Sequence, residues 1–253
     1  MMKALIFDMD GTLTPATQAV SPKMMESISL IRPWYKKYLV SGSDMEKIER
    51  QMSVEFLLSN FDKVFACNGT SVYNTRLDND DEAGALQPEL VHKIHLLDHY
   101  SQSDINHLIS YLLKIAGESH TMFKTGTFVE WRGSQINFSV VGRNCSLEQR
   151  EDYVKWDIKS SERQRIAEKL RKEFRGWGLV FNLGGQISLD ITRKEWDKTY
   201  AFENIQERPE ECIFFGDKII PGGNDYTIAM GCGKYYEVET PEDTLLLLEE
   251  YKG

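Results

Sequence analysis

The sequence predicts an α/β protein whose parallel-sheet core is built from both ends of the chain, with an α+β module that contains an antiparallel sheet inserted between them. Three observations lead to this prediction. Short apolar runs alternate with helical patterns in the first third of the chain, which is typical of βαβ units. The middle of the chain shows two hairpin patterns, and the alternation of short apolar runs with helical patterns returns after Ile191. We therefore expect core residues at 1–83 and 193–253, and the inserted module at 84–192.

The N-terminal part of the core is predicted to contain three strands and two helices. The strands are short apolar runs that end in polar residues or glycine, at residues 4–7, 38–40 and 64–66. Ser21 followed by Pro22 provides an N-cap and a first-turn proline for a helix that runs to about Ile31. Ser43 with Glu46 forms the capping-box pattern of the next helix.

The inserted module follows an acidic segment at residues 78–82, which we expect to be a solvated connector rather than a metal loop. Glycine-containing dipeptides at 133–134 and 184–185 predict two-residue hairpin turns. Apolar and polar residues alternate strictly in the last strand of the module. Ser188 and Asp190 should therefore share one face of that strand.

The C-terminal part of the core is expected to add a buried strand at residues 211–215 and a last helix that begins at Thr240. In open α/β sheets, ligands bind beyond the carboxyl ends of the strands. Polar residues follow three predicted strands at this edge, and a Gly-Gly-Asn-Asp loop comes soon after the last. The acidic residues concerned are Asp8, Asp10, Asp217 and Asp225.

Four carboxylates in one place would repel one another. Two unit charges about 4 Å apart interact by roughly 4 kcal/mol at an effective dielectric of about 20, so a bound cation is the natural remedy. Oxygen ligands favour Mg²⁺. A single aspartate at a strand end is more often a turn residue or a helix cap, but the pattern Asp-x-Asp-Gly-Thr directly after an apolar strand is far more specific.

Motifs along most of the chain resemble a known family. DMDGTL at residues 8–13 resembles the first motif of the haloacid dehalogenase superfamily of phosphotransferases, and Ser43, Lys198, 216–217 and 223–225 resemble its later motifs in order and spacing. Further segments narrow the resemblance to the eukaryotic-type phosphomannomutases, at 126–132, 141–143, 184–190, 196–198, 214–218 and 221–225. The resemblance implies a Rossmann-like core of haloacid dehalogenase type with an inserted α+β cap domain.

The resemblance also implies the catalytic roles. Asp8 would be the nucleophile that takes the phosphoryl group as an aspartyl phosphate, and Asp10 the general acid/base. Mg²⁺ would be bound by Asp8, the backbone carbonyl of Asp10, and Asp217, which would let an anionic carboxylate approach an anionic phosphate.

Phosphoryl oxygens would be held by Ser43 and Lys198, with Asn224 and Asp225 in support. Ser43 is also a candidate for a plain N-cap, and both interpretations can hold together, because a helix N-terminus favours anions. Outside the Trp-Asp-Lys match, Lys198 would be interpreted as a surface lysine.

The inserted module offers a polar sheet face that suits a sugar phosphate. Arg132, Asn137 and Ser139 can lie on the same face as Ser188 and Asp190 of the neighbouring hairpin. Guanidinium groups bind phosphate through two hydrogen bonds, although an ordinary solvated sheet face would show the same pattern. By resemblance, the substrate-binding residues of the cap are Arg132, Arg143, Arg150, Ser188 and Asp190.

Two positions depart from the family pattern. Thr17 stands where family members carry an arginine that contacts substrate, which bears on affinity or substrate range. Ala229 and Gly231 stand where a second metal-binding stretch would be, so we expect no extra cation site there.

Histidines are expected to play no part in the core chemistry, because all five fall within the predicted inserted module. His92, His95 and His99 have the i, i+3, i+7 spacing of one helical face, so a metal site on that face is an alternative with less support.

Composition and charge limit the expected partners. Hydrophobic residues at 41% and charged residues at 27% fit a globular protein with a sizeable core. A net charge of −9 has the wrong sign for general attraction to nucleic acid or anionic membranes, so we expect neither partner. The four cysteines are far apart without a Cys-x-x-Cys pair, and no apolar run is long enough for a signal peptide. These features favour a cytoplasmic protein.

The functional hypothesis is an isomerase of phosphomannomutase type, interconverting mannose 6-phosphate and mannose 1-phosphate and feeding GDP-mannose synthesis. A hexose 1,6-bisphosphate would be the intermediate and the activator. The resemblance further implies a homodimer formed through the cap. Two alternatives stay open: a Mg²⁺-dependent sugar-phosphate phosphatase with the same nucleophile, and a noncatalytic sugar-phosphate binder.

Overall fold

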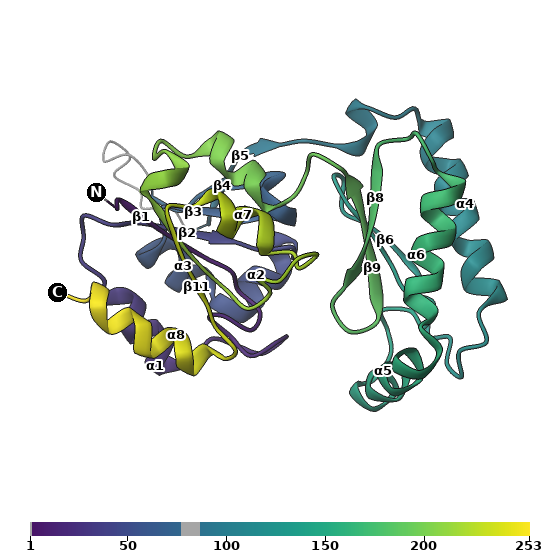
Figure 1. Cartoon of the computed structure of the whole chain (residues 1–253), viewed down its shortest axis with the longest axis horizontal. Helices are drawn as coiled ribbons and strands as arrows, with labels where there is room; N and C mark the ends of the chain where they lie inside the picture. The colour runs from purple at the N-terminus through teal and green to yellow at the C-terminus, as the bar shows by residue number, and fades with distance from the viewer. Residues whose placement is uncertain (1, 77–86) are drawn as a thin grey trace. The chain divides into compact units, whose positions relative to one another are not determined.

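The computed structural model describes residues 2–76 and 87–253 and divides the chain into two compact units (Figure 1). The core unit comprises residues 1–93 and 196–253, and the cap unit comprises residues 94–195. The cap unit begins ten residues later than the sequence predicts, because residues 89–93 form a strand of the core sheet. The predicted boundary after residue 83 and the acidic connector at 78–82 lie outside the described residues.

The core unit contains a mixed sheet of seven strands in the order β11-β10-β1-β2-β3-β4-β5. The first five of these pair in parallel, and β4 and β5 extend the sheet in antiparallel fashion. The bounds are β1 Ala4–Phe7, β2 Lys36–Val40, β3 Lys63–Ala66, β4 Ser71–Asn74, β5 Glu89–Lys93, β10 Cys212–Gly216 and β11 Lys234–Glu237. The predicted α/β class and the parallel strands are confirmed, whereas β4, β5 and β11 were not predicted.

Both faces of the core sheet are covered. Leu5 and Phe7 of β1 belong to one buried cluster, and Ala4 and Ile6 belong to the other. Two-sided burial is the reason why the central strands read as continuous apolar runs. The helices of this unit are α1 Pro22–Ser29, α2 Met45–Met52, α3 Val54–Asn60, α7 Tyr226–Gly231 and α8 Pro241–Leu248, with short 3₁₀ helices η1 Cys67–Gly69, η3 Lys198–Asn204, η4 Pro209–Glu211 and η5 Glu249–Tyr251.

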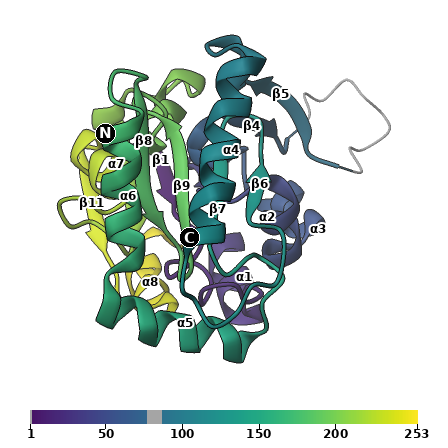
Figure 2. The same cartoon turned by 90° about the vertical axis from the view of Figure 1, so that its right-hand side faces the viewer.

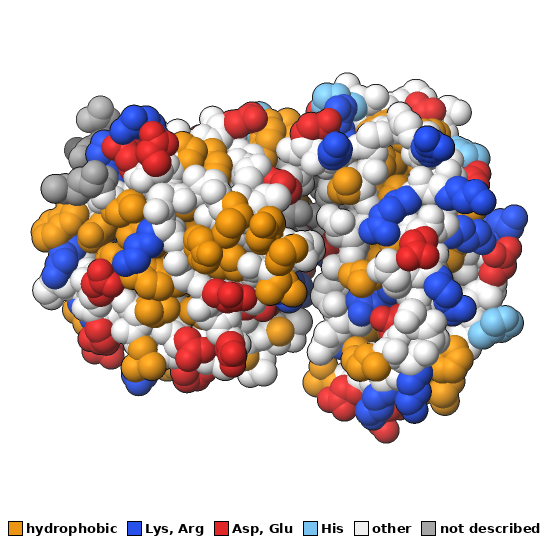
Figure 3. Space-filling model, in the orientation of Figure 1, with side chains coloured by type: hydrophobic (Ala, Val, Ile, Leu, Met, Phe, Trp, Pro, Cys, Tyr) orange, Lys and Arg blue, Asp and Glu red, His pale blue; other side chains and the backbone are white. Residues whose placement is uncertain are grey.

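The cap unit contains an antiparallel sheet of four strands in the order β6-β7-β9-β8, with α4 and α6 packed on one face (Figures 1 and 2). The two predicted hairpins are confirmed, but the predicted two-residue turn at 184–185 is wrong, because Gly184 pairs with Ser188 as the last residue of its strand and the turn comprises residues 185–187. The bounds are η2 Leu96–Asp98, α4 Gln102–Glu118, β6 Val129–Trp131, β7 Ile136–Phe138, α5 Leu147–Ser160, α6 Glu162–Glu173, β8 Leu179–Gly184 and β9 Ser188–Arg193. Leu189 and Ile191 are buried, as the alternation along β9 predicts. Basic side chains are conspicuous on the surface of the cap unit (Figure 3), where Arg165 and Lys169 of α6 are exposed.

The predicted placement of the histidines is wrong in two respects. His92 lies on β5 and therefore in the core unit, where its ring stacks on Tyr200. His95 is the N-cap of η2 and His99 follows the end of that helix, so His92, His95 and His99 do not share a helical face. The chain is extended through β5 before it turns, which separates residues that helical spacing would have aligned.

Among the residues that the structure describes, none of the helices has the length and apolar character that crossing a membrane requires.

Candidate active site

Three carboxylates meet at the carboxyl ends of β1 and β10, where the sequence predicts the site. One oxygen each of Asp8, Asp217 and Asp225 lies within 4.8 Å of the others. Asp8 and Asp225 are buried. Gly11 lets the loop after β1 come close to Asp217, because it adopts a φ of 88° and a Cβ at this position would lie 2.5 Å from Asp217 Oδ2. An L-residue at position 11 would be strained and would also push Asp217 aside.

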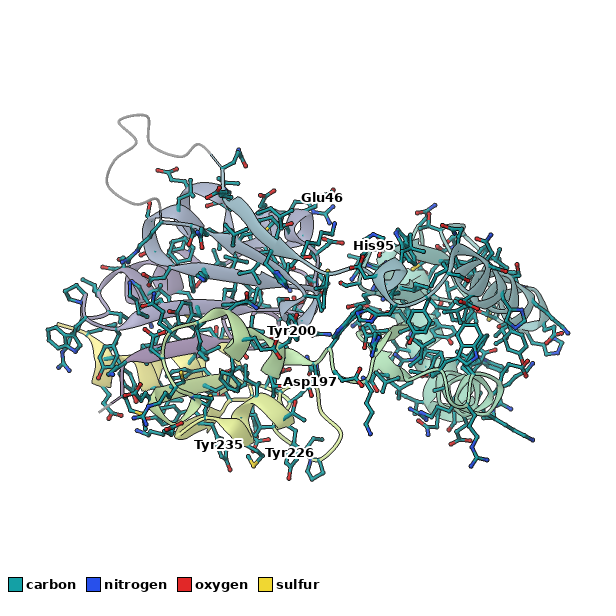
Figure 4. All side chains as sticks on the ribbon, turned by 90° about the horizontal axis from the view of Figure 1, so that it is seen from above. Glu46, His95, Asp197, Tyr200, Tyr226 and Tyr235 are labelled. Carbon is teal, nitrogen blue, oxygen red and sulfur yellow. The ribbon has the colours of Figure 1, made fainter. Side chains whose placement is uncertain are left out.

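Lys198 links two of these carboxylates. Its Nζ donates to Asp8 Oδ1 and to Asp225 Oδ1, each at 2.5 Å, and its side chain is fully buried. Asp197, which is labelled in Figure 4, precedes Lys198 as the N-cap of η3. Its side chain accepts from Thr199 N at 2.8 Å. The interpretation of Lys198 as a surface lysine is excluded.

Burial and charge act in opposite directions in this cluster. Burial raises the pKa of Asp8 to about 7, although Lys198 opposes the shift. Burial alone would lower the pKa of Lys198, but the carboxylates of Asp225 and Asp8 outweigh it and raise that pKa. Asp8 is therefore a carboxyl group whose charge depends on the cations around it.

The cluster fits a hard divalent cation such as Mg²⁺. It offers only oxygen atoms from three carboxylates, and its buried ammonium group, Lys198, pairs with two of them, whereas Lys218, which lies 3.5 Å from Asp217, is exposed. Asp217 Oδ1 is buried and accepts no hydrogen bond from any described residue. Burial raises the pKa of Asp217 and the charge of Asp225 adds to the shift, although Lys218 and Lys198 oppose it.

Asp10 is anchored away from Lys198 by partners on α2 and in the loop after β1. Lys47 Nζ donates to Asp10 Oδ2 at 2.5 Å, and Gln51 Nε2 donates to Asp10 Oδ1 at 3.0 Å. The backbone N–H of Thr17 also donates to Asp10 Oδ1, at 2.9 Å. Burial alone would raise the pKa of Asp10, but Lys47, Thr17 and Gln51 together lower it.

Ser43 does not cap α2, contrary to the predicted capping box. Asp44 is the N-cap and accepts from Lys47 N at 2.9 Å, because the helix begins one residue later, at Met45. The Ser43 hydroxyl accepts instead from Lys47 Nζ at 3.0 Å. Lys47 therefore connects Ser43 with Asp10, and sequence reasoning missed both Lys47 and Gln51. Ser43, Lys47 and Gln51 follow one another at intervals of four residues, which is the spacing of one helical face. This spacing was the signal in the sequence that could have identified them.

The loop before α7 contains the two residues assigned a supporting role. Asp225 accepts from Lys198 and also from the backbone N–H of Lys218, at 3.1 Å. Asn224 is exposed, and none of the described residues forms a hydrogen bond with its side chain.

In the cap unit, Glu130 holds two of the predicted substrate-binding arginines. Arg132 donates to Glu130 Oε2 from Nε at 3.0 Å and from Nη2 at 2.5 Å. Arg143 Nε lies 3.8 Å from the same oxygen. Sequence reasoning gave Glu130 no role, although it stands two residues before Arg132 in the predicted hairpin arm, where extended chain would place the two side chains on the same face.

Arg143 and Arg150 lie within electrostatic reach of this pair. Burial lowers the pKa of Arg143, Glu130 opposes the shift, and Arg132 and Arg150 lower it further. Arg150 comes from the first turn of α5. The structure thus places Arg132 and Arg143 at the Glu130 carboxylate and brings Arg150 within electrostatic reach of Arg143.

Asp190 lies opposite Asn137 in the strand register, as the predicted polar face requires. Its Oδ1 accepts from Asn137 Nδ2 at 2.6 Å and from Gln135 Nε2 at 2.7 Å. Burial raises the pKa of Asp190, and the two amides, together with the charges of Arg132 and Arg143, oppose the shift. Ser188 is buried and donates to the carbonyl oxygen of Gly184 at 2.9 Å.

Comparisons with known proteins agree with this geometry. A family model described as eukaryotic phosphomannomutase matches residues 24–251. The chain belongs to the eukaryotic phosphomannomutase family. It is 35% identical to a phosphomannomutase of Dendrobium officinale, over 95% of this chain and 90% of that protein. It is also 35% identical to a phosphomannomutase of Schizosaccharomyces pombe, over 97% and 93% of the two chains. It is thus an enzyme of phosphomannomutase type.

A solved structure of a haloacid dehalogenase-like hydrolase from Bacteroides thetaiotaomicron has the same fold. The TM-score is 0.62 over 99% of both chains, at 12% sequence identity. At that identity the likeness concerns the fold alone, and it supports the predicted haloacid dehalogenase type of the core.

Proposed function

We propose that this enzyme interconverts D-mannose 6-phosphate and α-D-mannose 1-phosphate through an aspartyl phosphate on Asp8 and a hexose 1,6-bisphosphate intermediate. The observation that carries the proposal is the carboxylate cluster around Lys198, in which Asp8 is buried and lies next to a cation. Phosphomannomutase relatives over most of the chain support the choice of reaction.

The first half-reaction follows from the chemistry of these residues. An Asp8 oxygen would attack one phosphorus of the bisphosphate, the bond between that phosphorus and the sugar oxygen would break, and Asp10 would give a proton to that oxygen, which leaves a hexose monophosphate. In the other half-reaction Asp10 would take the proton of the attacking hydroxyl of a hexose monophosphate, and the phosphoryl group would pass from Asp8 to that hydroxyl and form the bisphosphate again. Asp10 is anchored by Lys47, Gln51 and Thr17, which fix the starting position of its carboxylate.

Charge control in the core would be shared. Lys198 keeps Asp8 next to a fixed positive charge, and together with Ser43 it would bind the phosphoryl oxygens. Mg²⁺, held by Asp8, Asp217 and the backbone carbonyl of Asp10, would supply the positive charge that lets a carboxylate approach a phosphate. Asn224 and Asp225 would support this arrangement, and Asp225 does so by fixing Lys198.

The cap unit would bind the phosphate that is not being transferred. Arg132, Arg143 and Arg150 would contact that phosphate, and Ser188 and Asp190 would contact sugar hydroxyls. Support comes from the clustering of the three arginines and from the anchored Asp190 carboxylate.

Biological context extends the proposal. Mannose 1-phosphate is the sugar phosphate that a nucleotidyl transfer would convert to GDP-mannose, and a hexose 1,6-bisphosphate would activate the enzyme by phosphorylating Asp8. We also propose a cytoplasmic homodimer formed through the cap unit. Exposed apolar side chains on α5, namely Leu147, Trp156 and Ile158, support an interface in that unit.

The decisive experiment incubates the enzyme with mannose 1-phosphate, Mg²⁺ and a catalytic amount of glucose 1,6-bisphosphate. Mannose 6-phosphate should appear without stoichiometric release of inorganic phosphate. Release of phosphate without the 6-phosphate would instead identify a sugar-phosphate phosphatase. The same assay with glucose 1-phosphate tests which hexose is preferred.

A further inference from the structure

One carboxylate oxygen in the cap unit is shared by two arginines. Glu130 Oε2 accepts from Nε and Nη2 of Arg132 at 3.0 and 2.5 Å, and Arg143 Nε lies 3.8 Å away. The Arg132 side chain is only 9% exposed, whereas Glu130 is 33% exposed. The Nε and Nη2 edge of a guanidinium group is one of the edges that binds phosphate through two parallel hydrogen bonds. Glu130 therefore occupies a phosphate-binding edge of Arg132.

The second acidic residue of this cluster does not compete in this way. Asp190 Oδ1 accepts from the side-chain amides of Gln135 and Asn137, and no direct ion pair joins Asp190 to an arginine within the described residues. Arg132 and Arg150 make it harder for Arg143 to keep its proton, which shows that positive charge is crowded here. Glu130 is thus placed to offset that crowding by direct contact.

A mutase must be able to release phosphate from such a site as well as bind it, and here the inference rests on the proposed function. Each phosphate of the bisphosphate must be bound by the cap in one half of the cycle and released in the other. An arginine cluster without a competing anion would bind phosphate more tightly in both halves. Binding that is equally strong in the ground state and the transition state slows release without lowering the chemical barrier.

We propose that Glu130 is a built-in competitor for the cap arginines, which limits their affinity for phosphate so that the bisphosphate can leave the cap and rebind by its other end. Glu130 is a positioning residue in this scheme, because it acts on substrate only through Arg132 and Arg143.

Binding measurements on the full chain test the proposal without chemistry. Wild type and Glu130→Gln are titrated calorimetrically with mannose 6-phosphate, and separately with inorganic phosphate, in buffer that contains EDTA. Since partly exposed charge pairs contribute modest free energies, Glu130→Gln should bind both anions about 3- to 10-fold more tightly. Glu118→Gln is the matched control, because Glu118 also pairs with two cations, Lys114 and Lys169, but at an exposed site; its affinities should equal those of wild type.

Steady-state kinetics provide the second readout. Glu130→Gln should lower KM and kcat together, by similar factors, as expected when product release slows. Weaker or unchanged binding by Glu130→Gln would overturn the proposal, since it would mean that Glu130 only orders the arginines. If Glu130→Gln does not fold, Glu130→Asp provides the same test, because its shorter side chain should also release Arg132.

The proposed function and the proposed role of Glu130 can be refuted independently of each other. Wild type that bound mannose 6-phosphate but produced no mannose 6-phosphate from mannose 1-phosphate would refute the proposed function. Tighter binding by Glu130→Gln in that case would still support competition at the arginines, and would overturn only the link to bisphosphate release.

Discussion

Substitution of Lys198 by methionine tests the charge balance of the core cluster. Methionine nearly preserves the volume of the side chain but leaves Asp8, Asp217 and Asp225 without the ammonium group that contacts two of them. Removal of one partner from a buried ion pair typically costs about 3–5 kcal/mol. A change of 1 kcal/mol shifts Tm by about 2–4 °C in a protein of this size, so metal-free Lys198→Met should melt roughly 6–20 °C below wild type.

The loss in Tm of Lys198→Met should depend on pH and on the presence of Mg²⁺. Burial raises the pKa of Asp8 to about 7, so protonation of Asp8 at pH 6 would remove part of the repulsion that remains at pH 8. The loss in Tm should therefore be larger at pH 8, and Mg²⁺ should recover part of it. Lys218→Met is the matched control, because Lys218 lies 3.5 Å from Asp217 but is 57% exposed; it should change Tm little. An unchanged Tm for metal-free Lys198→Met at pH 8 would refute the reasoning.

Three further predictions concern buried charges. Burial lowers the pKa of Lys37 to about 8, so between pH 8 and 10 the unfolded chain binds more protons than the folded chain does. The free energy of unfolding should therefore rise as the pH increases from 8 to 10. Denaturant titrations should show this rise in wild type and not in Lys37→Met. Because Mg²⁺ would bind the ionised form of Asp8, its calorimetric affinity should be about tenfold weaker at pH 6 than at pH 8, and a flat profile would argue against Asp8 as a ligand. Asp8→Asn should lower mutase turnover by more than about a thousandfold while the circular dichroism spectrum stays native; retained turnover would exclude Asp8 as the nucleophile.

The central strands were predictable because burial on both faces makes their sequences continuously apolar. β1 was predicted to the residue at Ala4–Phe7. The outer strand β5 was not predicted, because most of its side chains are exposed and its sequence lacks a clear alternation. The start of α2 was predicted one residue too early, since Ser43 and Asp44 are both good N-caps and only tertiary contacts select between them.

Contacts between distant segments explain what sequence reasoning missed in the site. Lys47 and Gln51 read as ordinary polar residues of a surface helix, and their roles follow from Asp10, 37 and 41 residues away in the chain. Motif resemblance named the residues expected to meet substrate, but not the residues that hold them. Glu130 is one of the residues that hold others in place. Its role depends on Arg143, and no local sequence pattern connects Glu130 with Arg143.

Charge is balanced in opposite ways in the core and cap units, and under the proposed function both arrangements would serve reversible phosphoryl transfer. In the core, three carboxylates share one buried lysine, Lys198, which pairs with two of them, and the third is paired with the exposed Lys218, so additional positive charge would help a phosphate to approach. In the cap, Arg132 and Arg143 share one glutamate, which Arg132 contacts directly, so part of the positive charge gathered there is offset. A hydrolase gains from tight capture of a single phosphate, whereas a mutase must release and recapture the same molecule by its other end. Partial neutralisation of the arginines therefore favours a mutase, and Glu130→Gln is the substitution that isolates this effect from the chemistry on Asp8.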